Sequence, residues 1–479
     1  MADLTTMSDL YGAAAAGGEY TIAAGTYTLT EAGALPGNLT IAKDLTLTPV
    51  DGNVVIDGAD AYHVIVNDNG ASTTTHEIGD GDGVNTVQIT QGNTDCVVVD
   101  NNAAALTLNC HSCEFDNAAA GDGLSALASP AGDVAITCSD CDCHDNAKDG
   151  FSLESGTVDH FMVLNLVNTD SYNHTSAEPA DGDGVTAHKP KQIVNVSGGT
   201  FHNNAKGAMS IVEGSDLWCS GATFYNNANR GTLGPPLALM DAHIFVGKGS
   251  LPRAGSGYVE NCTFYGEDGY TPSKYDVRGY RCHSFVVTGC HFHDSEAYYY
   301  AVDMYDIDAG FLLQNLFQDM IGYRSPANFY MGAMYAGAGL IAHNTLHNCT
   351  RGFYLYSQGQ TVRNNIFSSV GSYAIRLAAA ATMTYKHHGE NGRNAFHNCG
   401  APVFYDDATA STAAQYRDTD LQATDPLFAD AAGGDFRLRI GSPCVNAVAG
   451  NPALTDDYRH IGAWQPKHRL LRPRIGGMG

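Results

Sequence analysis

Short apolar runs that alternate with polar residues recur along most of the chain. Each run is three to six residues long and is broken by Asn, Gly or Asp, as in Asp133–Cys138 and Gln192–Val196. The 3.6-residue spacing of apolar positions that marks an amphipathic helix is absent from these stretches. The pattern therefore predicts many short strands separated by turns, and it excludes a solenoid built from helices.

A recurring tripeptide gives these strands a period. It consists of a small or polar residue, any residue, and an aromatic residue or Leu, often followed by Asn, Asp or His. Its eleven occurrences lie 21 to 29 residues apart, except for one interval of 40. A unit of this length with two or three strands is typical of one rung of a right-handed parallel β-helix. The occurrences are Cys113–Phe115, Cys141–Cys143, Asp170–Tyr172, Gly199–Phe201, Ala222–Phe224, Cys262–Phe264, Cys290–Phe292, Asn315–Phe317, Asn344–Leu346, Asn365–Phe367 and Asn394–Phe396.

The first position of the repeat is expected to form a column inside the rod. Asparagines stacked in such a column bond amide to amide, and stacked cysteines act as small apolar filler. The alternative is a zinc site, because the Cys-x-x-Cys spacings resemble those of zinc ligands. We favour packing, since the two Cys-x-x-Cys pairs lie 28 residues apart, which is one rung. The column residues are Cys113, Cys141, Cys262, Cys290, Asn315, Asn344, Asn365 and Asn394, and the alternative zinc ligands are Cys110, Cys113, Cys138, Cys141 and Cys143.

Both ends of the rod need covers, because an open parallel sheet would pair with other chains. We predict an N-terminal cap over residues 1–20 with a short helix from Thr6 to Ala16, and the β-helix over 21–400. An excursion from the rod is expected near 230–257, and residues 401–479 are expected to form a C-terminal cap and basic tail. The predicted fold is all-β: a single-stranded right-handed parallel β-helix with a short N-terminal capping helix and a loop-rich C-terminal cap.

The composition limits which binding partners and which cellular locations are expected for the protein. The 479 residues include 25 Lys and Arg against 51 Asp and Glu, a net charge of −26, which disfavours nucleic acid as a partner. No run of 18 apolar residues occurs, so no membrane span is expected. The start of the chain, Met1–Thr6, lacks the basic and apolar regions of a secretory signal peptide. The odd number of cysteines, 13, argues against a disulfide scaffold. We therefore expect a virion or extracellular protein without a Sec signal peptide.

Segments near both ends of the chain resemble a known superfamily, from Gly17–Ile22 and Val54–Gly58 at the start to Asp425–Phe428 and His460–Trp464 at the end. The opening segments look like the first rungs of pectin-lyase-like right-handed parallel β-helix proteins, and the late segments resemble a terminal module of many bacterial and viral members. The resemblance implies the fold. It does not imply one chemistry, because the superfamily includes pectate and alginate lyases, polygalacturonases, phage tailspikes and members without known activity. The segments are Gly17–Ile22, Gly25–Tyr27, Leu45–Leu47, Val54–Gly58, Asp425–Phe428, Gly434–Leu438, Gly441–Pro443 and His460–Trp464.

Candidate chemistry centres on Asp-Gly steps. Asp122, Asp149 and Asp183 each precede a Gly, and stacking would place them on one edge of neighbouring rungs, about 5 Å apart. Carboxylates at that separation can cleave glycosides, whereas a lyase needs a base such as His or Lys. The same oxygens could instead hold calcium, or Asp-Gly could simply form the turn of each rung. The predicted catalytic residues are Asp149, Asp181, Asp183, His188 and Lys189; no cofactor other than calcium is expected.

Tyrosines gather between residues 298 and 356, and we predict that Tyr299, Tyr305, Tyr330 and Tyr354 bind substrate. An exposed tyrosine can pack its ring on a sugar and bond sugar hydroxyls through its own hydroxyl. The alternative is that about half of these rings fill the core.

Three functional classes stay open. The first is a virion-associated, tailspike-like or fibre-like protein that binds, and in an active form cleaves, cell-surface polysaccharide. The second is a free polysaccharide lyase or glycoside hydrolase, and the third is a purely structural virion component. The expected partners are polysaccharide and, through homotrimer formation or attachment, copies of the chain or other virion proteins.

Overall fold

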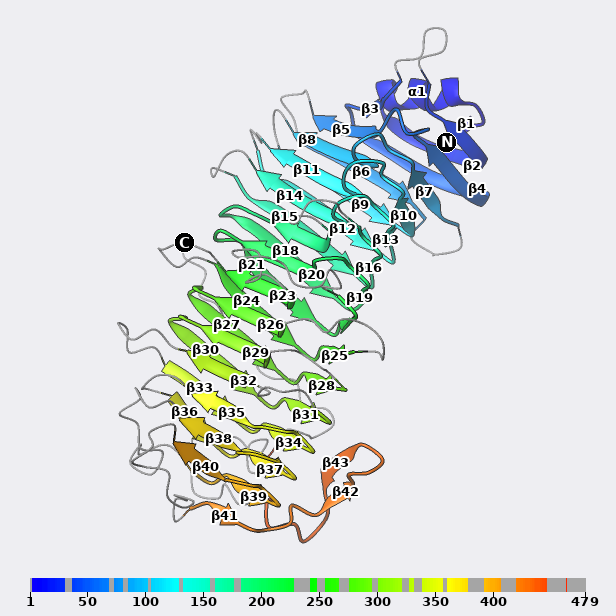
Figure 1. The fold of residues 1–479 in the computed structure, drawn as a ribbon. Helices are drawn as coiled ribbons and strands as arrows, with labels where there is room; N and C mark the ends of the chain where they lie inside the picture. The colour runs from blue at the N-terminus through cyan, green and yellow to red at the C-terminus, as the bar shows by residue number, and fades with distance from the viewer. Residues whose placement is uncertain are drawn as a thin grey trace.

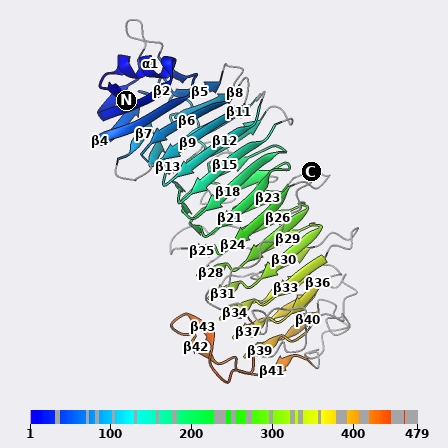
Figure 2. The same cartoon turned by 180° about the vertical axis from the view of Figure 1, so that it is seen from behind.

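A rod of stacked parallel strands makes up the body of the protein. In the computed structural model the strands follow one another in register from the N-terminal helix α1 to the hairpin β42–β43 (Figure 1), and the view from behind shows the same stack (Figure 2). Each rung adds one strand to sheet B and two to sheet A. The structure describes residues 2–30, 37–68, 73–80, 85–101, 105–128, 132–155, 160–175, 182–227, 242–247, 255–266, 275–294, 300–320, 327–330, 338–355, 360–377, 392–405, 419–445 and 462.

Sheet B forms one side of the rod, and its strands pair in parallel along the whole length. They are β3 (Leu39–Ile41), β5 (Val64–Asp68), β8 (Val97–Asn101), β11 (Leu124–Ala128), β14 (Phe151–Ser155), β17 (Asp183–Ala187), β20 (Gly207–Val212), β23 (Ala242–Gly247), β26 (Tyr275–Tyr280), β29 (Tyr300–Tyr305), β32 (Ala327–Tyr330), β35 (Phe353–Leu355), β38 (Ile375–Leu377) and β40 (Val403–Tyr405).

Sheet A contains two ladders, joined in the first rungs by the long strands β2 (Gly18–Thr28) and β4 (Leu45–Asp57). The first ladder comprises β6 (Thr74–Gly79), β9 (Leu106–His111), β12 (Val134–Ser139), β15 (Met162–Val167), β18 (Gln192–Ser197), β21 (Asp216–Ser220), β24 (Ser256–Glu260), β27 (Ser284–Thr288), β30 (Ala309–Leu313), β33 (Ala338–Ala342) and β36 (Gln360–Arg363). The second ladder comprises β7 (Val87–Thr90), β10 (Cys113–Asp116), β13 (Asp142–His144), β16 (Asp170–Tyr172), β19 (Thr200–His202), β22 (Thr223–Tyr225), β25 (Thr263–Tyr265), β28 (His291–His293), β31 (Leu316–Gln318), β34 (Thr345–His347), β37 (Ile366–Ser368), β39 (Ala395–His397) and β41 (Leu421–Gln422).

The turn between the two ladders uses one residue in the left-handed backbone conformation. Asp140, Asn168, Asn261 and Asn364 occupy it with φ between 49° and 58°. Asn and Asp enter this region at lower cost than other side-chain-bearing residues, because their short polar side chains can bond locally. The Asn and Asp residues that punctuate the sequence pattern therefore mark the corners of the rod.

The recurring tripeptide forms the second ladder, and its third position points into the core. Phe201, Phe224, Phe264, Phe292 and Phe317 stack there with ring centroids 4.8 to 5.3 Å apart. One occurrence was aligned wrongly from the sequence. Ser171, not Tyr172, pairs with both Cys143 and Phe201, because in this rung a small hydroxyl-bearing residue takes the core position and the aromatic residue points outward.

The first position of the repeat forms the predicted internal column. Asn344 lies between two equivalents: its Oδ1 accepts from Asn315 Nδ2 at 3.0 Å, and its Nδ2 donates to Asn365 Oδ1 at 2.9 Å. In the earlier rungs the backbone N–H of Cys113 points at the Sγ of Cys141, 3.4 Å away. All thirteen cysteines are free, and twelve are buried. The cysteines of the column thus pack in the hydrophobic core as predicted, and the zinc alternative is not tested.

The ends follow the prediction with adjusted boundaries. Helix α1 (Met7–Ala16) covers the first rung, and Thr6 begins it with a capping box formed with Asp9. However, β1 (Ala2–Leu4) already pairs with β2, so strands of the rod lie within the predicted cap. At the other end β40 and β41 still pair with β38 and β39, so the predicted end at residue 400 is about one rung short.

The remaining boundary concerns the excursion predicted near 230–257. The regular strand β23 lies inside this interval and pairs with β20 and β26, so the interval contains a full strand of sheet B. The sequence pattern missed it because Ala242–Gly247 is uniformly buried and has no polar alternation. After the last rung, β42 (Phe428–Asp430) and β43 (Asp435–Leu438) form an antiparallel hairpin, and the rest of the predicted tail is outside the described residues.

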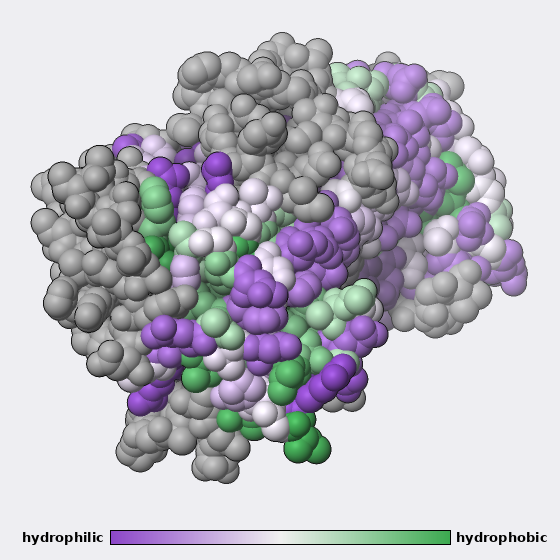
Figure 3. Space-filling view, turned by 60° about the horizontal axis from the view of Figure 1, so that its bottom comes forward, coloured by the Kyte–Doolittle hydropathy of each residue, from purple (hydrophilic) through white to green (hydrophobic). Residues whose placement is uncertain are grey.

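The surface offers few large apolar side chains among the residues described. Phe161, Phe404, Leu427 and Ile440 are exposed there, and Figure 3 shows small hydrophobic areas separated by hydrophilic ones on the face that it brings forward. Among the described helical residues, no helix is long and apolar enough to cross a membrane.

Candidate functional site

Four aspartates form a column at the edge of sheet B, which we call the aspartate column: Asp95, Asp122, Asp149 and Asp183. The pairing of β8, β11, β14 and β17 brings them into consecutive rungs. Asp95 Oδ1 accepts the backbone N–H of Asp122 at 2.7 Å, and Asp122 Oδ1 accepts that of Asp149 at 2.9 Å. Asp149 Oδ1 accepts that of Asp183 at 2.8 Å. The stacking expected from the Asp-Gly steps is present, and it satisfies backbone donors at the corner of each rung.

The column ends in a buried ion pair. Lys206 Nζ lies 2.6 Å from Asp183 Oδ2, and both side chains are 1% exposed. Gly207 follows Lys206 and leaves room for this contact, because a Cβ there would lie 2.8 Å from Asp183 Oδ1 and 2.7 Å from the carbonyl oxygen of Ala242. The close approach of backbone and carboxylate thus requires glycine at position 207.

Burial and mutual repulsion raise the pKa values of the carboxyl groups in the middle of the column. Burial, together with the charge of Asp183, raises the pKa of Asp149 to about 7, although Lys206 and two backbone N–H groups oppose the shift. Burial and the charge of Asp149 likewise raise the pKa of Asp122 well above its usual range. The column oxygens are buried and accept backbone N–H groups, an arrangement unlike the open set of carboxylate oxygens that calcium prefers. Calcium binding at these residues stays a prediction.

The shifted pKa of Asp149 predicts a pH-dependent effect of Asp149→Asn. A folded-state pKa of about 7 lies above the ordinary 3.8, so the contribution of protonated Asp149 is complete below pH 4 and is lost as the pH rises through 7. Asparagine reproduces the protonated form: its oxygen can accept from the N–H groups of Gly182 and Asp183, and its amide can donate to Thr186 Oγ1. We expect the variant to be close to wild type at pH 4 and more stable at pH 8, by up to about 4 kcal/mol for a shift of about three pKa units.

Thermal unfolding monitored by circular dichroism from pH 4 to 8 measures this difference. The control is Asp140→Asn, because Asp140 occupies a left-handed turn position that asparagine also fills in neighbouring rungs. A parallel pH profile for Asp149→Asn and Asp140→Asn would contradict the assignment of a retained proton to Asp149.

The other predicted catalytic residues do not join this column. His188 and Lys189 follow the C-terminal end of β17, five and six residues beyond Asp183, which is roughly 16–20 Å along an extended strand. The backbone N–H of His188 donates to Gln192 Oε1, and Lys189 forms an exposed ion pair with Glu213 at 3.4 Å. Asp181 is outside the described residues. The structure therefore brings Asp149 and Asp183 together but keeps His188 and Lys189 apart from them.

Three of the four predicted tyrosines lie on neighbouring strands of sheet B. Tyr305 pairs with Tyr330, and β35, which carries Tyr354, follows directly. Tyr305 and Tyr354 are half-buried rather than enclosed in the core. Tyr305 stacks on Tyr280 with centroids 5.0 Å apart, and the side chain of Tyr330 as well as all of Tyr299 are outside what the structure describes.

The sequence reasoning missed a charged and aromatic cluster beside these tyrosines. Arg278 Nε lies 2.9 Å from Asp303 Oδ2, and both side chains are nearly inaccessible. The guanidinium of Arg278 also lies 4.3 Å from the ring centroid of Tyr275 and 4.9 Å from that of Tyr280. A signal was present in the sequence. The spacing Tyr275-x-x-Arg278-x-Tyr280 recurs 25 residues later with Asp303 in the place of Arg278, so a shared rung position holds opposite charges.

Sheet B continues this pattern toward the C-terminal end. Arg376 pairs in register with Tyr354, and its guanidinium lies 4.5 Å from the ring centroid of Tyr354 and 5.7 Å from that of Tyr373. Both Tyr354 and Arg376 are half-buried. We call the set of Tyr305, Tyr354 and Arg376 the tyrosine–arginine strip. It combines aromatic rings, hydroxyl groups and a cation on the outer side of one sheet.

Comparison with known proteins agrees with the fold. The family described as right handed beta helix region matches residues 244–411, and no curated protein matches the chain. Among solved structures, similarity is found to an alginate lyase from Paenibacillus sp. strain FPU-7, at 14% identity and a TM-score of 0.42, over 69% of this chain and 97% of that one. It is also found to pectate lyase Pel9A, at 13% identity and a TM-score of 0.31, over 95% and 90%.

A third similar structure is the A-module of the mannuronan C-5 epimerase AlgE4 from Azotobacter vinelandii, at 13% identity and a TM-score of 0.33, over 87% of this chain and 91% of that module. Likeness at this level carries no argument about the fold, the substrate or the chemistry of this chain. The strand pairing and the family match together show that this chain is a right-handed parallel β-helix protein.

Proposed function

We propose that the protein binds an extended polysaccharide along the tyrosine–arginine strip of sheet B. The observation that carries the proposal is the placement of Tyr305 and Tyr354 on β29 and β35, with Arg376 on the next strand, all three half-buried on the outer side. Tyrosine offers an apolar ring and a hydroxyl group, which suits the mixed polarity of a sugar. Arginine adds N–H donors for hydroxyl or carboxylate groups.

The stacking within the strip determines how such a ligand would be contacted. One side of the Tyr305 ring packs on Tyr280, and the guanidinium of Arg376 lies over Tyr354. Ring surface used in these contacts is not open to sugar, so recognition falls to the remaining ring surface, the hydroxyls and the guanidinium N–H groups. Since strands are spaced at about 4.8 Å, a ligand with a repeating unit can make similar contacts on successive rungs.

Binding, rather than cleavage, is the centre of this proposal. Asp149 and Asp183 are 6% and 1% exposed, and their oxygens accept hydrogen bonds within the rung corner. A glycosidase carboxylate must reach the scissile bond, so a cleaving site built on these residues would need them uncovered. Cleavage, attachment to a virion and an extracellular location stay predictions, and detection of the protein in purified virus particles would support the virion class.

Tyr354→Ala is expected to weaken polysaccharide binding about tenfold, which corresponds to roughly 1.4 kcal/mol. The substitution removes the ring and the surface on which Arg376 rests, so both parts of the contact are lost. Binding is measured by affinity electrophoresis of the full chain in gels that contain one neutral or one uronate polysaccharide. Release of reducing sugar, or of unsaturated product seen by its absorbance, reports cleavage in the same panel.

The matched control is Tyr265→Ala, because Tyr265 is also a half-buried outward tyrosine but lies on the second ladder of sheet A. Its retardation in the gel should equal that of wild type. The proposed binding role of the strip would be contradicted if Tyr354→Ala and wild type were retarded equally by a polysaccharide that binds the protein. Absence of binding throughout the panel would contradict it as well.

A further inference from the structure

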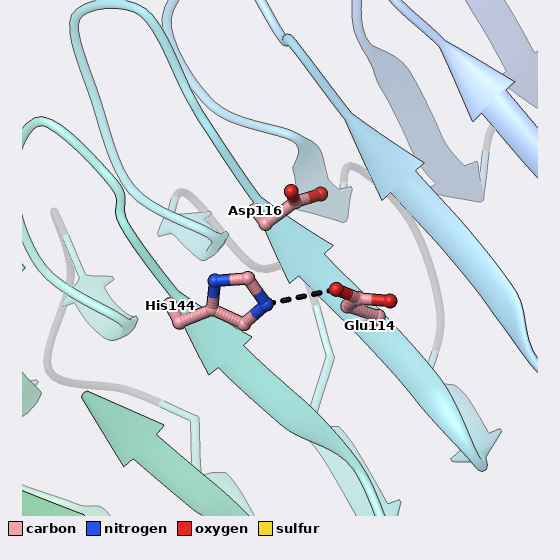
Figure 4. A group of neighbouring side chains, drawn as sticks. All are labelled: Glu114, Asp116 and His144. Carbon is pink, nitrogen blue, oxygen red and sulfur yellow. Dashed lines mark hydrogen bonds and ion pairs between the residues drawn. The ribbon is translucent and has the colours of Figure 1, made fainter. Parts of the chain in front are cut away.

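A second group of polar side chains lies on the other side of the rod, on the second ladder of sheet A. Glu114 and Asp116 are two residues apart on β10, so they share the outward side of the strand. Asp116 pairs directly with His144 on β13. Ligand atoms of these three side chains all lie within 4.8 Å of one another. Figure 4 shows the ring of His144 directed at the carboxylate of Glu114, with Asp116 beside them on β10.

The imidazole of His144 is held in one orientation. Its Nε2 lies 2.8 Å from Glu114 Oε1, and its Nδ1 lies 2.8 Å from Asp145 Oδ2. The ring stacks on Tyr172, with centroids 4.8 Å apart and planes 11° apart. That contact begins a continuous outward column of rings, which proceeds from His144 through Tyr172, His202, Tyr225, Tyr265 to His293. Rotation of His144 would therefore break a stack as well as two hydrogen bonds.

Asp116 is fixed as firmly. Its side chain is buried, and Gln88 Nε2 donates to its Oδ1 at 3.1 Å, while the amide of Asn117 donates to its Oδ2. Both of these donors are neutral amides, so they orient the carboxylate without neutralising its charge. A buried carboxylate without full charge compensation favours a nearby cation.

The surroundings of the group are acidic. Glu114, Asp142 and Asp170 occupy one register position on β10, β13 and β16, and Asp145 follows β13. These four carboxylates lie on three consecutive strands and the turn that follows one of them. The potential at this part of the ladder is therefore negative and attracts positive ions.

We propose that Glu114, Asp116 and His144 bind a divalent first-row transition metal cation of the Mn²⁺ or Zn²⁺ type. Two carboxylates and one imidazole are a donor set that these ions accept, whereas calcium takes oxygen ligands throughout. An ion of charge +2 balances the two carboxylates when the imidazole is neutral. Ligand atoms around such an ion lie roughly 3.0–3.5 Å apart when metal–ligand bonds are about 2.1 Å. Rotation of the half-buried Glu114 side chain completes the site, while His144 and Asp116 keep their orientations.

Asp145 supports the same assignment from outside the group. A metal-binding histidine usually bonds a carboxylate through its other ring nitrogen, which fixes the tautomer that presents the free nitrogen to the metal. The contact between His144 Nδ1 and Asp145 has this arrangement and leaves Nε2 facing Glu114. An ion pair between His144 and Glu114 without metal is the competing arrangement, and the experiment below separates the two.

The test is a titration of the full chain, stripped of metal with EDTA, with Mn²⁺ alone, while electron paramagnetic resonance reports the free ion. We expect one Mn²⁺ to be bound per chain, and Zn²⁺ to displace it. Asp116→Asn and His144→Gln should each weaken binding at least about tenfold. The control is Asp142→Asn, which removes the same charge from the neighbouring strand position of Glu114 and should change affinity less than about threefold.

Two further measurements exclude unfolding of a variant, and metal binding by the free cysteines, as explanations of the result. Circular dichroism verifies that each variant is folded, and Mn²⁺ should raise the melting temperature of wild type and Asp142→Asn but not of Asp116→Asn. Bound Co²⁺ should show ligand-field bands without the thiolate charge-transfer band that cysteine ligation gives. The proposal is overturned if Mn²⁺ stays free up to roughly 1 mM, if Asp116→Asn binds like Asp142→Asn, or if Co²⁺ shows thiolate ligation.

Discussion

Replacing Lys206 by methionine is expected to lower the free energy of unfolding by about 3–5 kcal/mol. The substitution preserves most of the side-chain volume but removes the ammonium group that lies 2.6 Å from Asp183. The carboxylate of Asp183 then stays buried at 1% exposure, next to Asp149 in the same column. Removal of one partner of a buried pair leaves the other charge without compensation, and this costs more than the pair itself contributes.

Urea unfolding followed by circular dichroism measures the loss, and two variants make it interpretable. Lys189→Met is the matched control, because Lys189 forms a pair with Glu213 whose side chains are about half exposed, and an exposed pair contributes about 1 kcal/mol or less. The double variant Asp183→Asn/Lys206→Met should recover most of the stability, since it removes both charges of the pair. A single Lys206→Met variant as stable as Lys189→Met would contradict the importance of this pair.

The repeat made the rod predictable, because the same physical constraint recurs in every rung. A small or amide-bearing residue must fit the corner, and an apolar residue must follow two positions later, so the second ladder is visible in the sequence as Cys262–Phe264 or Asn365–Phe367. Stacked amides at Asn315, Asn344 and Asn365 confirm the column that this pattern predicted. A constraint repeated eleven times can be recognised even when single rungs deviate.

Single deviations were what the sequence could not resolve. Ser171 occupies a core position that holds phenylalanine in the next rung. Tyr172, one residue later, points outward but matches the third position of the tripeptide in sequence. Strand β23 has no polar alternation, because residues on both of its sides are buried. In each case the space left by the neighbouring rungs determines which side chains face the core. The sequence of the segment alone does not show that space.

The candidate sites also contain a part that repeats with the rung, which the sequence predicts, and a part that does not repeat, which it does not predict. Asp-Gly steps predicted the stack of Asp122, Asp149 and Asp183, since equal steps at the rung period must align. The partner of Asp183 was less visible, because Lys206 reaches it from the segment before β20 and not from the paired position, which is Gly207. Long side chains that cross between rungs leave no periodic signal.

Asn344→Ala is expected to cost about 2–4 kcal/mol of stability, because it interrupts the asparagine column in the core. Asn344 Oδ1 accepts from both the backbone N–H and the side-chain amide of Asn315, each at 3.0 Å. Its Nδ2 donates to the carbonyl oxygen of Leu312 and to Asn365 Oδ1, each at 2.9 Å. Alanine removes all four bonds at a position without access to water, and it leaves a small cavity.

A cysteine at the same position separates the hydrogen bonds from the volume. Cys141 accepts the backbone N–H of Cys113 through its Sγ in an earlier rung of this column, so Asn344→Cys can retain a weak acceptor for Asn315 and fill part of the cavity. We expect its loss of stability in urea to lie between those of wild type and Asn344→Ala. Asn195→Ala serves as the control, because Asn195 donates to Asn165 in a half-buried outward stack where water can replace the bond. Equal losses for Asn195→Ala and Asn344→Ala would show that the internal amide column does not stabilise the rod beyond what an outward stack does.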